Sequence, residues 1–183
     1  MATNKPVEVD QLFGGLQPSE SNNQWFVVHT KPRQEKKLAQ YCLQNAINYF
    51  LPLQNSTKVY QRRKVTFMKP LFSGYVFLRC SDKQQVILFR SGNIVRFLKV
   101  YDEAELLIDL NNIYQSTSQN LPIERHPYLE EGYKVKIVKG PYKDVEGIVV
   151  DSENPEKVIV GIHLIQQAIC VEVTPDDIKR LKN

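Results

Sequence analysis

The sequence predicts an α+β N-terminal domain, an antiparallel sheet with flanking helices, followed by a small all-β barrel. Strand and helix patterns alternate up to about residue 118, which is typical of helices packed on a sheet. After a proline-containing segment only short strand patterns follow, and about five strands in so few residues favour a small barrel. A chain of 183 residues is long enough for two small domains.

The N-terminal end differs in composition from the rest. Residues 1–23 are rich in Asn, Gln, Ser, Pro and Gly, so we expect a flexible tail. Leu12, Phe13 and Leu16 are apolar exceptions that either pack on the first domain or a partner, or belong to the disordered tail. The expected boundaries beyond the tail are a first domain at 24–118, a linker at 119–128 and the barrel at 129–183.

Within the first domain, Trp25 to His29 reads as a buried strand, and a helix follows it. The second helix is expected to be capped by Ser81 or Asp82, with Val86 and Phe89 facing inward. The other expected elements are strands at 49–53, 71–78 and 94–100, a hairpin at 55–66, and helices at 82–90 and 103–117.

The strongest strand pattern lies in the second domain. Apolar and basic residues alternate over 133–137, which predicts a strand with one apolar and one basic face. Gly140 and Gly147 bracket a short turn, where glycine suits a tight backbone. Pro155 and Gly161 disfavour a long helix farther on. The expected elements are strands at 133–138, 146–151, 157–163 and 168–173, and a terminal turn at 178–181.

Three segments carry a resemblance to a known family. Residues 131–150 resemble a KOW motif, a strand-loop-strand element of small SH3-like barrels. The segment 69–78, Lys-Pro-Leu-Phe-Ser-Gly-Tyr-Val-Phe-Leu, resembles the Gly-Tyr-Val segment of the NGN domain of NusG proteins, and 25–31 resembles the start of that domain. The order of these segments over 24–183 is similar to that of the NusG family, and the details are most similar to its specialised RfaH-like and UpxY-like members.

This resemblance implies a transcription elongation and antitermination factor. It would bind elongating RNA polymerase at the clamp of the largest catalytic subunit, suppress pausing or termination at a specialised set of operons, and tether a partner through its KOW domain. That partner is the small ribosomal subunit or Rho, and non-template DNA is a further expected contact. Two alternatives stay open: a housekeeping NusG that also recruits Rho, and a ribosomal or RNA-binding KOW protein. A monomer is expected.

Phe72, Tyr75 and Phe77 match the aromatics with which NusG-like proteins grip the polymerase clamp. Tyr75 and Phe77 share a face of their strand. The alternative is ordinary core packing, the usual state of aromatic residues in strands. Ser73 stands where most relatives have proline.

Lys31, Lys37, Tyr41 and Arg90 match RfaH positions that face the non-template DNA strand. Cations beside an aromatic suit phosphate contact and base stacking. A solvated helix face explains them equally well. The basic run at 62–64 lies in the expected hairpin and is a further candidate for phosphate contact.

Tyr142, Lys143 and Asp144 lie in the turn between the two glycines. The resemblance implies that Tyr142 and its neighbours contact the ribosomal or Rho partner. The alternative is that the aromatic ring shields the end of the barrel.

No catalytic constellation is evident. His29, His126 and His163 are far apart and no phosphate loop, nucleophile elbow or metal motif is present. We therefore expect no enzyme activity, no cofactor and no metal. The spacing of the cysteines suits neither a disulfide framework nor zinc, so small buried hydrophobes are expected. The cysteines are Cys42, Cys80 and Cys170.

The net charge of +4 permits an anionic partner without requiring one. No run is apolar and long enough to cross a bilayer, and the first residues lack the apolar core of a secretory signal. A cytoplasmic location, without a membrane partner, is expected.

Overall fold

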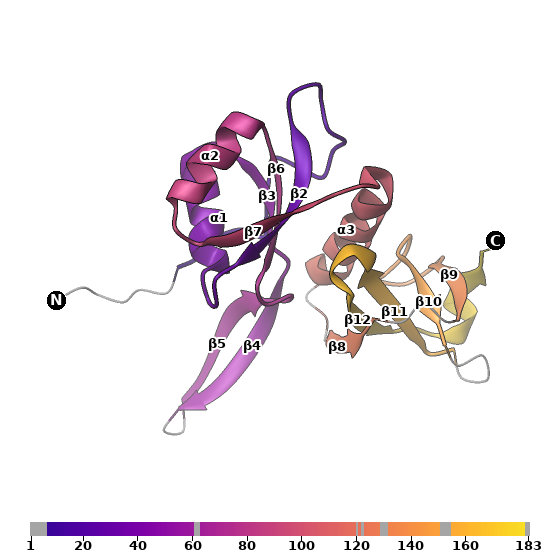
Figure 1. Cartoon of the computed structure of the whole chain (residues 1–183). Coiled ribbons are helices and arrows are strands. Elements are labelled where there is room, and N and C mark those ends of the chain that lie inside the picture. The colour runs from indigo at the N-terminus through magenta and orange to yellow at the C-terminus, as the bar shows by residue number, and fades with distance from the viewer. Residues whose placement is uncertain are drawn as a thin grey trace. The chain divides into compact units, whose positions relative to one another are not determined.

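The chain folds as two compact units, Met1–Glu103 and Ala104–Asn183. The structure is a computed structural model (Figure 1). It describes residues 7–60, 63–119, 121, 123–128, 132–150 and 155–181.

The N-terminal unit is built on a five-stranded antiparallel sheet with strand order β1-β3-β6-β2-β7. Two helices and a separate two-stranded ribbon, β4–β5, complete it. The elements are β1 (Leu12–Phe13), β2 (Gln24–Thr30), α1 (Glu35–Gln44), β3 (Asn48–Phe50), β4 (Leu53–Tyr60), β5 (Arg63–Pro70), β6 (Tyr75–Cys80), α2 (Asp82–Arg90) and β7 (Ile94–Lys99).

One face of this sheet packs against α1 and α2. Val28 of β2 lies opposite Val76 of β6, and both belong to a buried cluster with Leu38 and Cys42 of α1 and Leu88 of α2. The alternation of side chains along each strand brings these apolar residues to the same side. The predicted sheet with flanking helices is confirmed.

Helix α2 begins with the predicted cap. The Ser81 hydroxyl accepts from the Gln84 N–H, and the Gln84 side chain accepts from the Ser81 N–H, which forms a capping box. The inward orientation expected for Val86 and Phe89 is wrong, because these residues are 57% and 54% exposed. They are three residues apart and share one helix face, whereas Leu88 is the buried residue of this helix.

The N-terminal segment is an ordered part of the first unit over residues 7–23, not the flexible tail that was expected. Strand β1 pairs with β3, with Leu12 opposite Phe50. The Trp25 indole N–H donates to the Gln17 carbonyl (2.8 Å), and the Tyr49 hydroxyl donates to the Asp10 carbonyl (2.9 Å). Backbone pairing and two buried aromatic donors therefore hold the segment on the domain. Residues 1–6 of the expected tail lie outside the described residues.

The C-terminal unit contains a six-stranded antiparallel sheet with strand order β13-β9-β10-β11-β12-β8. It confirms the predicted all-β domain, and the four main strands lie where the sequence predicts them. The elements of this part are helix α3 (Glu103–Ser118), β8 (Glu124–Pro127), β9 (Tyr133–Ile137), β10 (Glu146–Val149), β11 (Lys157–Ile162), the 3-10 turn η1 (His163–Ile165), β12 (Gln167–Glu172), the 3-10 turn η2 (Pro175–Asp177) and β13 (Ile178–Arg180).

Three features of this unit differ from expectation. All of α3 after Glu103 groups with the C-terminal strands, although we expected it to close the first domain at residue 118. Part of the expected 119–128 linker is strand β8, which pairs with β12. The expected terminal turn at 178–181 contains strand β13, which pairs with β9. Each of these depends on pairing or packing between residues distant in sequence.

Candidate functional site

Tyr75 begins β6 immediately after a tight turn. Gly74 has φ +86°, a conformation that favours glycine. The Thr30 N–H donates to the Gly74 carbonyl (2.8 Å), and the Gly74 N–H donates to the Glu35 carboxylate (2.6 Å). Glu35 is buried, at 5% exposed. The turn is therefore held on one side by the end of β2 and on the other by the first turn of α1.

The Tyr75 ring is partly exposed and is stacked on a neighbour. His29 lies directly opposite it on β2, with the ring centroids 5.3 Å apart and the ring planes at 25°. Two stacked rings on paired strands make a rigid aromatic surface. This surface includes the only one of the three predicted polymerase contacts that is not buried.

Phe72 and Phe77 are 1% and 0% exposed. Phe77 lies on the same face of β6 as Tyr75 and packs against Phe50 of the neighbouring strand, with the centroids 6.1 Å apart. The alternative weighed from the sequence, core packing, describes their state in the structure. Their expected role as polymerase contacts stays a prediction.

The four predicted nucleic-acid contacts border the junction of α1 and α2. The Tyr41 hydroxyl donates to the Ile87 carbonyl (3.2 Å), which joins the two helices. Lys37 is exposed one turn before Tyr41, and Arg90 is exposed at the end of α2. The Lys31 N–H donates to the Asn93 carbonyl (2.8 Å), just beyond Arg90. Three separate segments therefore meet here.

Sequence reasoning missed an exposed aromatic at this junction. Phe89 precedes Arg90 and is 54% exposed, with one side packed against Phe97 at a centroid distance of 5.0 Å. The helical spacing of Val86 and Phe89 indicated an inward face instead, so the sequence held no signal for the exposure of Phe89. A large exposed aromatic is more informative about function than a buried one.

The turn of the C-terminal unit places its three predicted residues differently. Tyr142 is only 4% exposed, while Lys143 and Asp144 are exposed. Burial, with a smaller effect from the charge of Glu172, raises the pKa of the Tyr142 hydroxyl. Asp144 has φ +72° and forms an ion pair with Lys136 (3.3 Å). Tyr142 is thus buried and its expected role as a partner contact stays a prediction, while Lys143 and Asp144 are the accessible residues.

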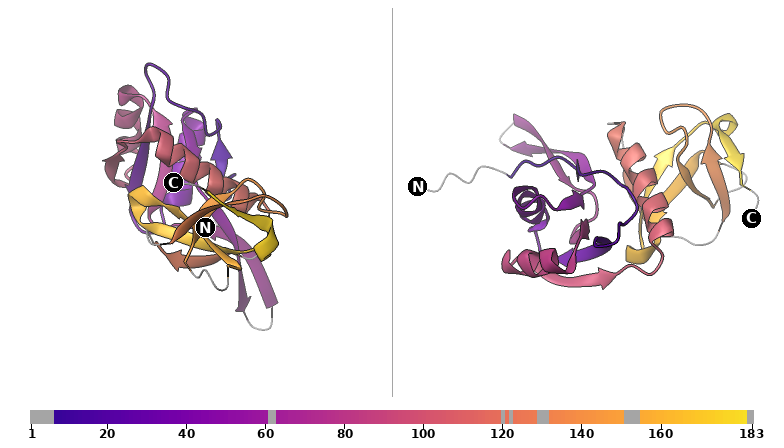
Figure 2. Two further views of the ribbon diagram at one scale, coloured as in Figure 1. Left: turned by 90° about the vertical axis from the view of Figure 1, so that its right-hand side faces the viewer. Right: turned by 90° about the horizontal axis from the view of Figure 1, so that it is seen from above.

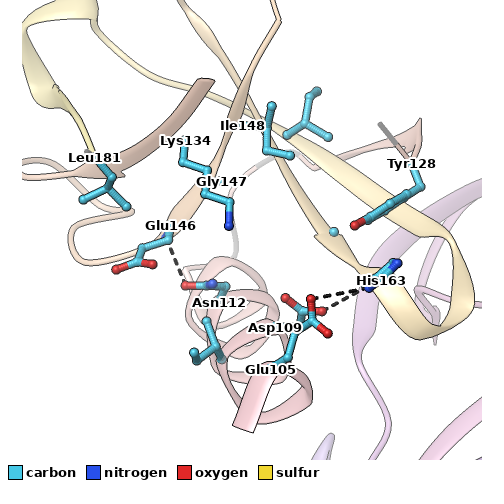
Figure 3. Close-up of a pocket in the computed structure, with 13 residues that line it drawn as sticks. Glu105, Asp109, Asn112, Tyr128, Lys134, Glu146, Gly147, Ile148, His163 and Leu181 are labelled. Atoms are coloured by element: carbon cyan, nitrogen blue, oxygen red, sulfur yellow. Dashed lines mark hydrogen bonds and ion pairs between the residues drawn. The ribbon is translucent and has the colours of Figure 1, made fainter. Parts of the chain in front are cut away.

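Helix α3 meets the strands of its unit through polar contacts that no sequence pattern indicated. The Glu146 N–H donates to the Asn112 side chain, and the His163 N–H donates to Asp109, each over 3.0 Å (Figure 3). The His163 ring lies 3.4 Å from Glu105 and stacks on Tyr128. A pocket of about 150 Å³ lies between the helix and the strands. Burial raises the pKa of Asp109 to about 6, and the nearby Glu105 carboxylate adds to the shift.

Metal ligands, cysteines and membrane-spanning helices are the remaining features that bear on function. No group of three His, Cys, Asp or Glu side chains suited to a metal occurs in the described part of the chain. All three cysteines are free and buried, as predicted. Burial raises the thiol pKa of Cys80 to about 12, which disfavours the reactive thiolate. Among the described helices, none has the length and apolar character needed to span a bilayer.

Comparison with known proteins gives one consistent family. The family model described as "Transcription termination factor nusG" matches residues 23–115. The transcription termination/antitermination protein NusG of Rickettsia typhi is 23% identical over 93% of this chain and 98% of its own length. The corresponding Rickettsia conorii protein is 24% identical over 90% of this chain and 94% of its own.

Two solved structures were also matched, each at 19% identity over 87% of this chain and 98% of the other. One is from a study of domain interaction in Thermotoga maritima NusG, with a TM-score of 0.48. The other is an MjSpt4:Spt5 complex, with a TM-score of 0.29.

Proposed function

Since the chain belongs to the NusG family of transcription termination and antitermination factors, we propose that it binds elongating RNA polymerase at the clamp of the largest catalytic subunit. There it suppresses pausing or termination at a specialised set of operons. Binding that favours the closed clamp over the open one shifts a conformational equilibrium and needs no catalysis.

The observation that carries this proposal is the presentation of Tyr75. Its ring is partly exposed, stacked on His29, and backed by a turn bonded to both β2 and α1. A rigid aromatic surface provides a large contact area at a low cost in conformational entropy. Tyr75 is therefore the proposed direct contact, whereas Phe72 and Phe77 are buried.

The junction of α1 and α2 is the proposed contact with the non-template DNA strand. Lys31, Lys37 and Arg90 supply exposed positive charge, and Tyr41 lies among them. Phe89 adds an exposed ring beside Arg90. Phosphate contacts from the cations and stacking of a base on an aromatic ring are the usual components of single-strand binding.

The C-terminal unit is the proposed tether to the small ribosomal subunit or to Rho. Lys143 and Asp144 are the exposed residues of its turn, and a second binding site on the same chain raises the local concentration of its partner. Recruitment of Rho would assign the chain the housekeeping role, and recruitment of the ribosome without Rho would support the specialised one.

The test is binding of the full chain to bacterial core RNA polymerase, measured as a dissociation constant. Tyr75→Ala is expected to weaken binding at least tenfold. Tyr101→Ala is the matched control, because Tyr101 is a tyrosine in the same unit that is 87% exposed. No binding by the folded wild-type chain, or equal binding by Tyr75→Ala, would overturn the proposal.

A further inference from the structure

The β4–β5 ribbon, defined here as residues 53–70, is a strongly basic element of the N-terminal unit. That segment contains five Lys or Arg residues and no Asp or Glu. The whole chain carries +4, and this segment alone contributes +5, so the rest of the chain is net −1. The ribbon's charge of +5 is therefore not offset by any acidic residue within the segment.

The ribbon projects from the domain instead of packing into it (Figure 1, Figure 2). Its base is fixed, because Leu53 and Leu71 are 4% and 0% exposed and the Leu71 N–H donates to the Pro52 carbonyl (2.8 Å). Beyond the base, most of its described residues are exposed. A two-stranded ribbon gains little stability from its own packing, so its length has no evident structural purpose.

The strand register places three of the cations on one face. Residues directly opposite each other in an antiparallel pair share a face. Gln54 lies opposite Lys69, Lys58 opposite Val65, and Tyr60 opposite Arg63. Lys58, Arg63 and Lys69 therefore share one face, and Lys64 lies on the other. All four are exposed, and Arg62 lies outside the described residues.

The basic face is long and narrow. Arg63 and Lys69 are six residues apart on one strand, which corresponds to about 20 Å at about 3.4 Å per residue. A DNA duplex carries about 12 phosphate charges over that length. The major groove of B-form DNA admits a two-stranded ribbon, whereas that of A-form RNA is too deep and narrow for side chains to read.

The ribbon side chains that the structure describes are less suited to single strands. Binding of single strands relies on aromatic faces that are free to stack on bases. Among the ribbon's described side chains, the aromatic one is Phe67. The Lys58 ammonium lies over its ring, 5.6 Å from the centroid, and so occupies one face of the ring. Two acidic residues from the N-terminal segment, Glu8 and Asp10, line a groove together with Val65 and Phe67 of the ribbon.

We infer that the β4–β5 ribbon is a binding site for double-stranded DNA, with Lys58, Arg63, Lys64 and Lys69 contacting phosphates. This site is distinct from the proposed polymerase contact and from the α1–α2 junction. The competing explanation is that these lysines protect the exposed sheet edges from aggregation. Under that explanation the ribbon would have no particular affinity for DNA.

The test is fluorescence anisotropy of a labelled 30-base-pair DNA duplex titrated with the full chain at several salt concentrations. One variant replaces Lys58, Arg63, Lys64 and Lys69 by Gln. The matched control replaces four exposed lysines elsewhere by Gln and changes the net charge equally: Lys83, Lys99, Lys157 and Lys179. Circular dichroism melting checks that both variants are folded.

The wild-type chain should bind the duplex. The negative slope of log affinity against log salt should be less steep for the ribbon variant, by about 3 to 4 in magnitude. Its affinity at low salt should fall at least tenfold, while the control keeps both values. A third variant, which replaces Lys58, Lys64 and Lys69 by Arg, should bind like wild type because it keeps the positive charges.

Equal losses in the ribbon and control variants would overturn the inference, because they would indicate a general charge effect. Equal or tighter binding of single-stranded DNA or duplex RNA would also overturn it. Tyr75→Ala should bind the duplex normally, so a failure of the polymerase proposal leaves this measurement unaffected.

Discussion

The Glu35 carboxylate accepts a hydrogen bond from the backbone N–H of Gly74 over 2.6 Å. This bond connects α1 to the turn that presents Tyr75, although the two residues are far apart in sequence. Glu35→Ala would leave the Gly74 N–H without its acceptor, at a cost of about 1–3 kcal/mol. We expect a lower melting temperature and weaker polymerase binding, measured by calorimetry and by titration.

Glu35→Gln is the informative control for this contact. The amide keeps an acceptor oxygen but loses the charge, and hydrogen bonds to charged groups are stronger. Its melting temperature should fall between those of wild type and Glu35→Ala. If Glu35→Ala melts like wild type, the bond does not hold the turn.

The Ser81 cap gives a second prediction. Ser81→Ala removes the hydroxyl that accepts from the Gln84 N–H and should destabilise the protein by about 1 kcal/mol. Ser21→Ala, at an exposed position before β2, should have almost no effect. Denaturant unfolding of the two variants distinguishes them, and equal midpoints would show that the capping box contributes nothing.

The two glycines that bracket the C-terminal turn have different physical roles. Gly140 has φ +80°, so Gly140→Ala is expected to cost about 1 kcal/mol of backbone strain. At Gly147 a Cβ atom would lie 2.5 Å from Val158 Cγ1 and 2.6 Å from the Ile159 carbonyl oxygen. Gly147→Ala should therefore cost about 1–3 kcal/mol by overpacking. Thermal melts that rank the two variants in the opposite order would contradict this.

The partly buried Asp109 predicts a dependence of stability on pH. Its pKa is raised from 3.8 to about 6, so the folded protein binds the proton more tightly than the unfolded chain. The resulting stabilisation is complete below about pH 4 and is lost as the pH rises through about 6. A pKa raised from 3.8 to about 6 corresponds to on the order of 3 kcal/mol.

Asp109→Asn tests that dependence. The amide oxygen can still accept from the His163 N–H, and the side chain stays uncharged at every pH. Compared with wild type, the variant should gain stability as the pH is raised from 4 to 7.5. The measurement is the free energy of unfolding of both proteins across this pH range. If the two free energies changed in parallel with pH, the prediction would be contradicted.

Elements with strong local signals could be predicted from the sequence. The alternation over 133–137 identified β9, and Ser81 or Asp82 as a cap identified the start of α2. These signals depend on residues within one turn or one strand. The family resemblance was visible for the same reason, since its motifs are short and contiguous.

Features that depend on distant partners could not be predicted. The N-terminal segment is polar, yet Leu12 pairs with Phe50 across nearly 40 positions. Strand β8 contains Arg125 and His126 and lacks the apolar alternation that marks a half-buried strand. Likewise, the burial of Phe77 and exposure of Phe89 depend on which side chains pack around each ring.

The most direct test of the central claim is single-round transcription by bacterial RNA polymerase on a template with a defined pause. The lifetime of the pause is measured without the chain, with wild type, with Tyr75→Ala and with the Tyr101→Ala control. We predict that wild type and Tyr101→Ala shorten the pause, and that Tyr75→Ala leaves it nearly unchanged. A pause unaffected by wild type, or shortened equally by Tyr75→Ala, would contradict the assignment of Tyr75 to the polymerase contact and of this chain to antitermination.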